Sequence, residues 1–202
     1  MTIQNNKSSE IFSLLYTDTA LERYYQNIVC QDLCLKQNYK NIMECATLDK
    51  IVCNTSSKFY ASDKELILPA ITALEMITGQ KPKYTCAKKS ISTFKLRQFQ
   101  ILGSKNSLRK TKMYRFLEKY IAIVSIRIKD WNEKTTKPFT NRGSKDYVVL
   151  NSNLFPELQQ HDELFQNVTG IQISLSSTSF AKTKIIKEKD SMLLYSAFQI
   201  IV

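Results

Sequence analysis

The distribution of charge is the strongest constraint on how this chain can fold. Residues 81–129 hold 14 of its 29 lysines and arginines and one acidic residue, Glu118. That segment has a net charge of +13, whereas residues 1–80 sum to −2 and residues 130–202 to zero. So dense a positive charge repels itself unless anions lie nearby. The whole basic excess of the 202 residues therefore belongs to one region.

This basic segment favours a polyphosphate partner, because lysine and arginine neutralise phosphates and release their counterions. Nucleic acid is the leading interpretation; a membrane surface, an acidic protein or a merely solvated lysine-rich face are the alternatives. RNA is favoured over DNA, since the sequence has no recognition-helix motif, zinc finger or basic region followed by heptads. Aromatic residues that could stack on bases are interleaved with the charges: Tyr84, Phe94, Phe99, Tyr114 and Phe116.

Several classes of function lack the residues they need. The chain has only four glycines, so it has no glycine-rich loop that could cradle a phosphate, and one histidine, His161. The neighbouring Asp162 does not make a triad with it, because adjacent side chains rarely face each other. Glu118 is the sole acid of the basic segment, so no converging carboxylates suit a metal-dependent nuclease. We predict a protein that is not an enzyme and has no cofactor and no metal site.

The five cysteines are expected to be reduced. Their number is odd and the chain is not a small secreted scaffold, which argues against a disulfide framework. Cys30 and Cys34 are one helical turn apart and could share a ligand, but no histidine is near and no C-x-x-C pair exists. Buried thiols acting as small hydrophobes are therefore favoured over zinc. The longest apolar stretch, residues 66–74, is too short to span a bilayer, so no membrane partner is expected.

Hydrophobic periodicity predicts a mixture of helices and strands without regular βαβ alternation. Helices are expected within residues 11–36, after a capping box at 62–65 up to Gly79, over 113–124 and over 186–198. Strands are expected at 47–54, around Tyr84, and at 94–97, 105–109, 147–150 and 171–175, with a loop over 130–146. The fold class is therefore α+β, a single domain with a mainly antiparallel sheet.

An ordered series of short motifs resembles large-subunit ribosomal protein five, the family that binds 5S rRNA. The series covers about residues 22–200 nearly without gaps, so we expect an N-terminal extension, 1–21, before an RNA-binding domain, 22–202. Residues 31–39, Gln31-Asp-Leu-Cys-Leu-Lys-Gln-Asn-Tyr39, look like mitochondrial members and imply a mitochondrial location. The motifs are Gly79-Gln-Lys-Pro82, Ala87-Lys-Lys-Ser90, Phe94-Lys-Leu-Arg-Gln98, Leu108-Arg109, Arg127-Ile-Lys-Asp-Trp131, Pro138-Phe139, Asn141-Arg-Gly143, Phe155-Pro-Glu157 and Gly170-Ile-Gln-Ile173.

The resemblance implies a curved sheet packed on helices, at the central protuberance of the large ribosomal subunit. It implies that 5S or an equivalent rRNA, with large-subunit rRNA, is bound by Asn54, Gln80, Lys81, Ser107 and Arg109. An extended loop, about residues 85–97, would reach the peptidyl-site tRNA through Lys88, Lys89, Ser90, Lys95 and Arg97. Residues 141–163 would face the small-subunit head and its ribosomal protein thirteen, and neighbouring large-subunit proteins would surround the rest. An extraribosomal assembly factor or RNA chaperone is the alternative.

The chain departs from the family at three glycine positions. Family members usually carry glycine after the positions of Asn54, Gln98 and Arg109. Here those sites read Thr55-Ser56-Ser57, Phe99 and Lys110. Phe99 and Lys110 therefore add bulk where the backbone of a relative can approach RNA.

Overall fold

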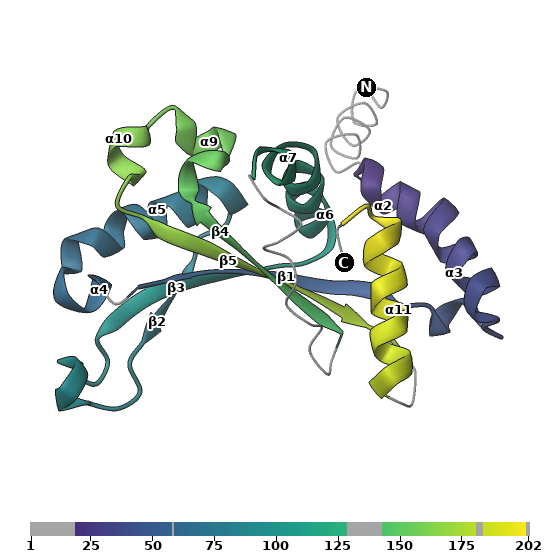
Figure 1. Ribbon diagram of the computed structural model, residues 1–202, viewed down its shortest axis with the longest axis horizontal. Coiled ribbons are helices and arrows are strands. Elements are labelled where there is room, and N and C mark those ends of the chain that lie inside the picture. Colours follow the sequence, from purple (N-terminus) through teal and green to yellow (C-terminus); the bar gives the residue numbers. More distant parts are fainter. Residues whose placement is uncertain (1–18, 58, 129–142, 181–183, 201–202) are drawn as a thin grey trace, which may run out of the picture.

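The computed structural model describes residues 19–57, 59–128, 143–180 and 184–200 (Figure 1). Its centre is a twisted antiparallel sheet of five strands in the order β2-β3-β1-β5-β4. The strands are β1 Thr47–Ser56, β2 Lys83–Cys86, β3 Ile101–Leu108, β4 Ser144–Asn151 and β5 Thr169–Thr178. The predicted α+β class with a mainly antiparallel sheet is confirmed.

Helices lie against one face of the sheet and around its end (Figure 1). The α-helices are α2 Ala20–Tyr24, α3 Cys30–Gln37, α4 Phe59–Ser62, α5 Ile67–Thr78, α6 Lys110–Lys119, α7 Ser125–Arg127, α9 Pro156–Gln159, α10 Asp162–Phe165 and α11 Lys184–Ala197. Two π-helical turns, Tyr25–Val29 and Tyr120–Val124, join α2 to α3 and α6 to α7. Short 3-10 turns are Ile42–Glu44, Lys64–Leu66, Ser92–Phe94 and Ser152–Leu154.

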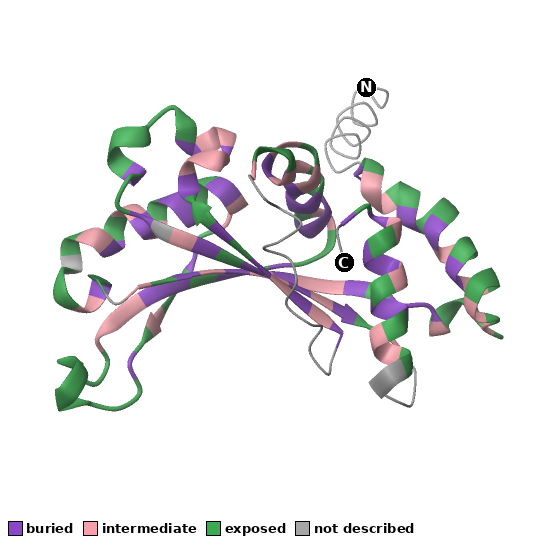
Figure 2. Ribbon diagram, in the orientation of Figure 1, coloured by how far each residue is buried: buried purple, intermediate pink, exposed green. Residues whose placement is uncertain are grey.

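The core lies between these helices and the sheet. In β1 the side chains of Ile51, Cys53 and Thr55 are buried, and the residues between them are not, as the pleat requires. The apolar residues of the helix expected over residues 113–124 pack against these side chains. The buried ones are Met113, Phe116, Leu117, Tyr120 and Val124. Figure 2 shows this division: buried residues line the sheet and the inner sides of the helices.

The long helix α5 has the predicted apolar side and the predicted end. Pro69 lies in its first turn, where a backbone N–H has no partner within the helix. Gly79 ends it at a φ of 62°, and its N–H donates to the Glu75 carbonyl at 2.8 Å. The predicted capping box is wrong, since Ser62 ends α4 and a 3-10 turn leads into α5.

Helix α11 packs at the opposite end from α4. The Tyr195 hydroxyl contacts the carbonyls of Gly143 and Leu175 at 3.1 and 3.2 Å, and the Ser177 and Ser191 hydroxyls lie 2.8 Å apart. Glycine is required at 143, because a Cβ there would lie 2.2 Å from the Ser191 Oγ. The predicted C-terminal helix is confirmed, and it lies on the same side of the sheet as the core.

Three local predictions need correction or fall outside the described part. Residues 94–97 do not form a strand: the chain turns there, and Ile91 and Leu96 make only an isolated bridge. The predicted loop over 130–146 is wrong at its end, because β4 begins at Ser144; residues 130–142 and 11–18 lie outside the described residues. No helix in the described ranges has the length and apolar character to cross a membrane.

Candidate nucleic-acid interface

The face of the sheet that points away from the core, here called the open face, carries polar and basic side chains. One row crosses all five strands: Lys83 pairs with Lys105, Lys105 with Asn54, Asn54 with Gln172, and Gln172 with Val148. A second row runs from Ser107 through Val52 and Ser174 to Asp146. All these side chains are exposed or half-buried. The open face can therefore be reached by a large partner.

Two lysines directly face each other in the first row. Lys83 and Lys105 are cross-strand partners, and both are exposed. Like charges placed opposite each other destabilise a sheet. An anion held between the two ammonium groups would reverse this effect, so the pair has the character of a phosphate site. Asn54, next in the row, adds an amide that both donates and accepts hydrogen bonds.

Of the predicted rRNA-binding residues, Asn54 and Ser107 lie on this open face, on the adjacent strands β1 and β3. Gln80 and Lys81 lie shortly before β2, at the end of that strand where Lys83 pairs with Lys105 of β3. Arg109 directly follows β3 at the same end. The sheet therefore brings all five predicted residues to one region, although three of them lie outside the strands.

Gln80 is held in place by a buried side chain that the sequence did not single out. The Asn106 amide donates to the Thr78 Oγ1 at 2.6 Å and to the Gln80 carbonyl at 2.7 Å. Asn106 lies on the core side of β3 and is 2% exposed. It thereby fixes the turn between α5 and β2, and with it the position of Gln80 and Lys81. Asn106 lies between Lys105 and Ser107 in the sequence, and both of those residues are on the open face. Because successive side chains of a strand point to opposite faces of the sheet, Asn106 points to the core.

Arg109 has a partner of its own in the protein. Its Nη1 donates to the Asp49 Oδ1 at 2.8 Å, and the arginine side chain is 58% exposed. An exposed ion pair of this kind is weak and is screened by salt. The pair orients the guanidinium and leaves some of its five donors for an RNA phosphate.

The predicted tRNA-contacting loop is the tip of the β2–β3 hairpin, which projects from one end of the sheet (Figure 1). Lys88, Lys89, Lys95 and Arg97 are all exposed there, as the exposed colouring of the tip in Figure 2 makes visible. Ser90 has a structural contact, because its Oγ accepts a hydrogen bond from the Gln98 N–H at 3.0 Å. The loop is thus braced across its width while its charges face outwards.

A further bond anchors the hairpin to the body of the protein. The Gln100 Nε2 donates to the Ala61 carbonyl of α4 at 2.8 Å, and its Oε1 accepts from the Arg97 N–H at 3.1 Å. Backbone bonds between Ala87 and both Phe99 and Gln100 continue the hairpin beyond β2. These contacts hold the loop between β2 and β3, residues 87–100, in place against the body of the protein. This loop is here called the hairpin arm.

The interleaved aromatic residues divide into two groups. Tyr114 and Phe116 are buried in the core, whereas Tyr84, Phe94 and Phe99 are 53%, 66% and 76% exposed. All three exposed rings belong to the β2–β3 hairpin or its tip, beside the lysines. Aromatic faces next to cationic groups suit the stacking of unpaired RNA bases.

Part of the basic segment is structural. Lys119, the last residue of α6, donates to the Ile77 carbonyl at 2.8 Å and forms an ion pair with Glu157. Its side chain is 20% exposed. Lys119 therefore joins α6 to α5 and α9, and it is not available on a basic surface.

The two bulky residues at family glycine positions keep a backbone that favours glycine. Phe99 has a φ of 64° and Lys110 a φ of 52°. A side chain in this left-handed region costs about 1–2 kcal/mol. Thr55 is different, since it is an ordinary buried residue of β1. Residue type alone could not show that Phe99 and Lys110 have a left-handed backbone and that Thr55 does not.

The sequence also missed the residues that complete the open face. Lys83 and Lys105 come from the hairpin strands β2 and β3, whereas Gln172 and Ser174 come from β5, which is far from them in the chain. Alternation within each strand was the available signal, but it does not say which strands are neighbours.

Comparison with known proteins agrees with the motif series. The family profile described as "Ribosomal protein L5" matches residues 41–97, and the profile for the C-terminus of the same ribosomal family matches residues 101–201. The relative named Large ribosomal subunit protein uL5m of Prototheca wickerhamii is 72% identical, over 95% of this chain and 87% of its own length.

More distant relatives cover nearly the same span. The uL5m protein of Reclinomonas americana is 38% identical over 89% of this chain and 96% of its own length. The uL5 protein of Nitrosomonas europaea is 36% identical over the same shares of the two chains. These matches confirm the predicted family, and they agree with the prediction of a structural protein that is not an enzyme. The chain belongs to the ribosomal protein L5 family, in its mitochondrial form.

Proposed function

We propose that the protein is a constituent of the large subunit of the mitochondrial ribosome and holds 5S or an equivalent rRNA on its open face. The observation that carries this proposal is the row Lys83, Lys105, Asn54 and Gln172, which crosses four adjacent strands at an accessible surface. Facing lysines take up phosphates, and the amides beside them reach sugars and base edges. Large-subunit rRNA is the further partner expected at the ends of this row.

Gln80, Lys81, Ser107 and Arg109 extend the same surface at one end of the sheet. Lys81 and Ser107 are exposed, and Arg109 presents its guanidinium beside Asp49. Short polar groups and a forked guanidinium suit contacts to the sugars and phosphates of a folded RNA, which position the protein on it. They suit contacts that read the base sequence of a duplex less well. This arrangement supports recognition of rRNA by shape.

The hairpin arm has a separate role in this proposal, contact with the peptidyl-site tRNA. Its four cations and the exposed rings of Phe94 and Phe99 lie at the tip, away from the row on the sheet, whereas the exposed ring of Tyr84 belongs to β2. Such an arm suits the elbow of a tRNA, where phosphates and unpaired bases occur together.

We further propose that residues 141–163 face the small-subunit head and its ribosomal protein thirteen. The exposed acids Asp162 and Glu163 in the first turn of α10 would suit a basic partner.

We keep the division into an N-terminal extension, residues 1–21, and an RNA-binding domain, residues 22–202, as part of this proposal. The matched family profiles begin at residue 41, and α2 begins at Ala20, capped by the Thr19 side chain. Residues 1–18 lie outside the described residues.

The test is sedimentation of the native protein through a sucrose gradient of mitochondrial lysate, followed by ultraviolet crosslinking and mass spectrometry of the RNA-linked peptides. We expect the protein in the large-subunit peak and crosslinked peptides that contain Lys83, Lys105 or Asn54. Absence from that peak would overturn the ribosomal assignment. Crosslinks confined to other surfaces would overturn the role of the open face alone.

The alternative is an extraribosomal assembly factor or RNA chaperone that uses the same surface. The same gradient distinguishes the two, since an assembly factor would be found in precursor particles and not in subunits engaged in translation.

A further inference from the structure

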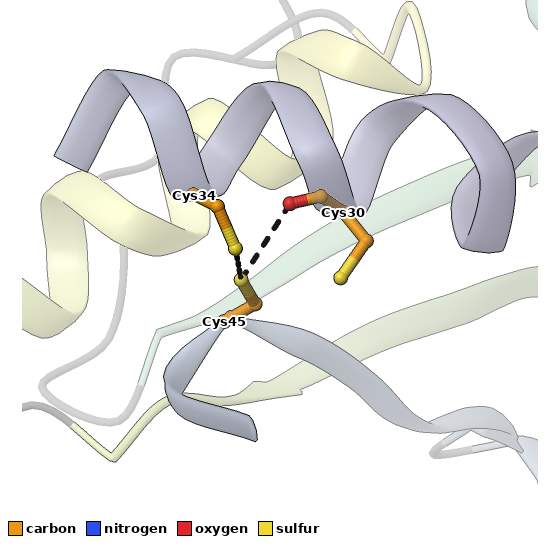
Figure 3. Close-up of side chains that lie close together, drawn as sticks. All are labelled: Cys30, Cys34 and Cys45. Carbon is orange, nitrogen blue, oxygen red and sulfur yellow. Dashed lines mark hydrogen bonds between the residues drawn. The ribbon is translucent and has the colours of Figure 1, made fainter. Parts of the chain in front are cut away.

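Three cysteines from two segments meet beside α3 (Figure 3). Cys30 and Cys34 lie on successive turns of that helix, and Cys45 comes two residues before β1. Their Sγ atoms all lie within 4.8 Å of one another, and those of Cys34 and Cys45 are 3.0 Å apart. The sequence pointed to the first pair only, because Cys45 is brought in by the turn that follows α3.

A hydrogen bond joins the two segments that carry this thiol cluster. The Tyr25 hydroxyl donates to the Ala46 carbonyl at 3.0 Å, which ties the turn before Cys30 to the residue after Cys45. Cys45 is 1% exposed, whereas Cys30 and Cys34 are half-buried. One sulfur is therefore fixed in the interior, and the other two leave a path from solvent.

We propose that Cys30, Cys34 and Cys45 bind one zinc ion through three thiolates, with solvent as the fourth ligand. Zinc–sulfur bonds of about 2.3 Å in a tetrahedron place the sulfurs about 3.8 Å apart. The Cys34 and Cys45 sulfurs, 3.0 Å apart, are closer than that value, and all three lie within 4.8 Å of one another, so small side-chain rotations are enough. Three soft donors on a half-buried site, with a way in for the metal, meet the requirements for a thiolate-bound ion.

Zinc suits the site better than a monovalent soft ion such as Cu(I). Three thiolates carry three negative charges, and a divalent ion leaves only one of them uncompensated. Uncompensated charge is costly in a partly buried site. Histidine and acidic side chains do not contribute to this cluster, as far as the described residues show.

A disulfide between Cys34 and Cys45 is the competing use of these thiols. It would release two protons and two electrons to an oxidant, such as a small-molecule disulfide, and would leave Cys30 without a role. A disulfide joins only two sulfurs, whereas the third sulfur, that of Cys30, lies within 4.8 Å of both of the others. The three-sulfur geometry therefore favours the metal.

Zinc bound by these three cysteines would cross-link α3 to the segment that leads into β1. The chain between Cys34 and Cys45 passes through Asn38, which has a φ of 53°, and the 3-10 turn Ile42–Glu44. An ion that binds only the folded arrangement stabilises it in proportion to the logarithm of its concentration over the dissociation constant.

The test uses the purified full-length chain, reduced and freed of metal with a chelator, then titrated with zinc chloride. We expect about one zinc per chain by mass spectrometry of the metal, and a thiolate-to-metal charge-transfer band when cobalt(II) replaces zinc. Cys30→Ser and Cys34→Ser should each weaken zinc binding at least about tenfold and remove the cobalt band. Cys86→Ser, at an exposed cysteine outside the cluster, is the matched control and should bind as the parent does.

Folding of each variant is checked by circular dichroism, and the melting temperature should rise with zinc only when the cluster is intact. The proposal is overturned if the parent chain binds no more zinc than the Cys34→Ser variant, or if it binds Cu(I) but not zinc. It is also overturned if the protein isolated without reductant has lost two hydrogens through a Cys34–Cys45 disulfide. Ribosomal sedimentation is a separate measurement, so failure of the metal site would leave the proposed function standing.

Discussion

The side-chain amide of Asn106 connects the core of the sheet to Gln80, 26 residues earlier in the chain, by a hydrogen bond of 2.7 Å. Its second contact, to the Thr78 hydroxyl at 2.6 Å, fixes the end of α5 in the same way. A residue that does not face RNA in our proposal thus decides where an RNA-facing residue sits.

Replacement of Asn106 by leucine should lower the free energy of unfolding by about 1–3 kcal/mol, because it leaves the buried partner groups without a donor. Urea denaturation measures this loss. RNA affinity at a temperature where the variant is folded should also fall, since the Gln80 turn loses its tether. Ser107→Ala, on the exposed side of the same strand, is the stability control and should change it by less than about 0.5 kcal/mol. An unchanged unfolding free energy for the leucine variant would contradict the role of Asn106.

Lys105→Gln should weaken RNA binding and reduce the slope of log affinity against log salt by about one, since one phosphate contact is lost. The free protein should be slightly more stable, because the repulsion with Lys83 is removed. Filter binding over a range of salt and thermal unfolding measure the two effects. Lys112→Gln, at a lysine of α6, makes the same charge change away from the open face. Equal effects of the two variants would mean that only net charge matters.

Replacement of Lys88 and Lys89 by glutamate should weaken contact with tRNA while binding of 5S rRNA survives, because both residues lie on the hairpin arm. Toeprinting of ribosomes with the variant and filter binding of 5S rRNA measure the two contacts. The control pair Lys36 and Lys40, changed to glutamate, alters charge equally on an exposed part of another region. Loss of 5S rRNA binding in the hairpin variant alone would contradict the division of roles.

Phe99→Gly and Lys110→Gly should each be neutral or stabilising by up to about 1 kcal/mol, the reverse of the usual effect of glycine. Both positions have a positive φ that glycine adopts without strain. Urea denaturation provides the measurement. Phe94→Gly, at another exposed aromatic position of the hairpin, serves for comparison and should not stabilise. A clear loss of stability in both glycine variants would show that their side chains outweigh the backbone strain.

Alkaline conditions should destabilise the protein through its buried tyrosines. Burial raises the pKa of Tyr114 from 10.0 to about 12, so folding favours the neutral phenol. That contribution is complete below pH 10 and is lost as pH rises through 12, because the unfolded chain ionises first. The free energy of unfolding, followed with tyrosinate absorbance, should decline over this range. Tyr114→Phe should decline less steeply, and an identical slope would contradict this assignment.

The candidate site could be predicted from the sequence only in part. Lys88, Lys89, Lys95 and Arg97 lie close together in the chain, and the family resemblance placed them on one extended loop, although local pattern predicted a strand at residues 94–97. Asn54 and Ser107 came from the family resemblance, and Lys83, Lys105 and Gln172 were missed. These five residues occupy β1, β2, β3 and β5, and their adjacency depends on strand order.

Among the helices, the α6 segment shows the same distinction. Its period of apolar residues predicted which side is buried, because that depends on neighbours three and four residues away. The period could not show that Lys119, off that side, would meet the Ile77 carbonyl and Glu157. A helix surface becomes solvent or interface only when other elements pack on it.

The sequence by itself determined the basic segment, the α+β class and the family, since these depend on composition, local periodicity and residue order. The tertiary structure decided which charges face outwards, which polar residues hold the fold, and that Cys45 joins Cys30 and Cys34. Each of these depends on contacts between residues distant in the chain. Such contacts are set by packing of the whole core, which no local pattern contains.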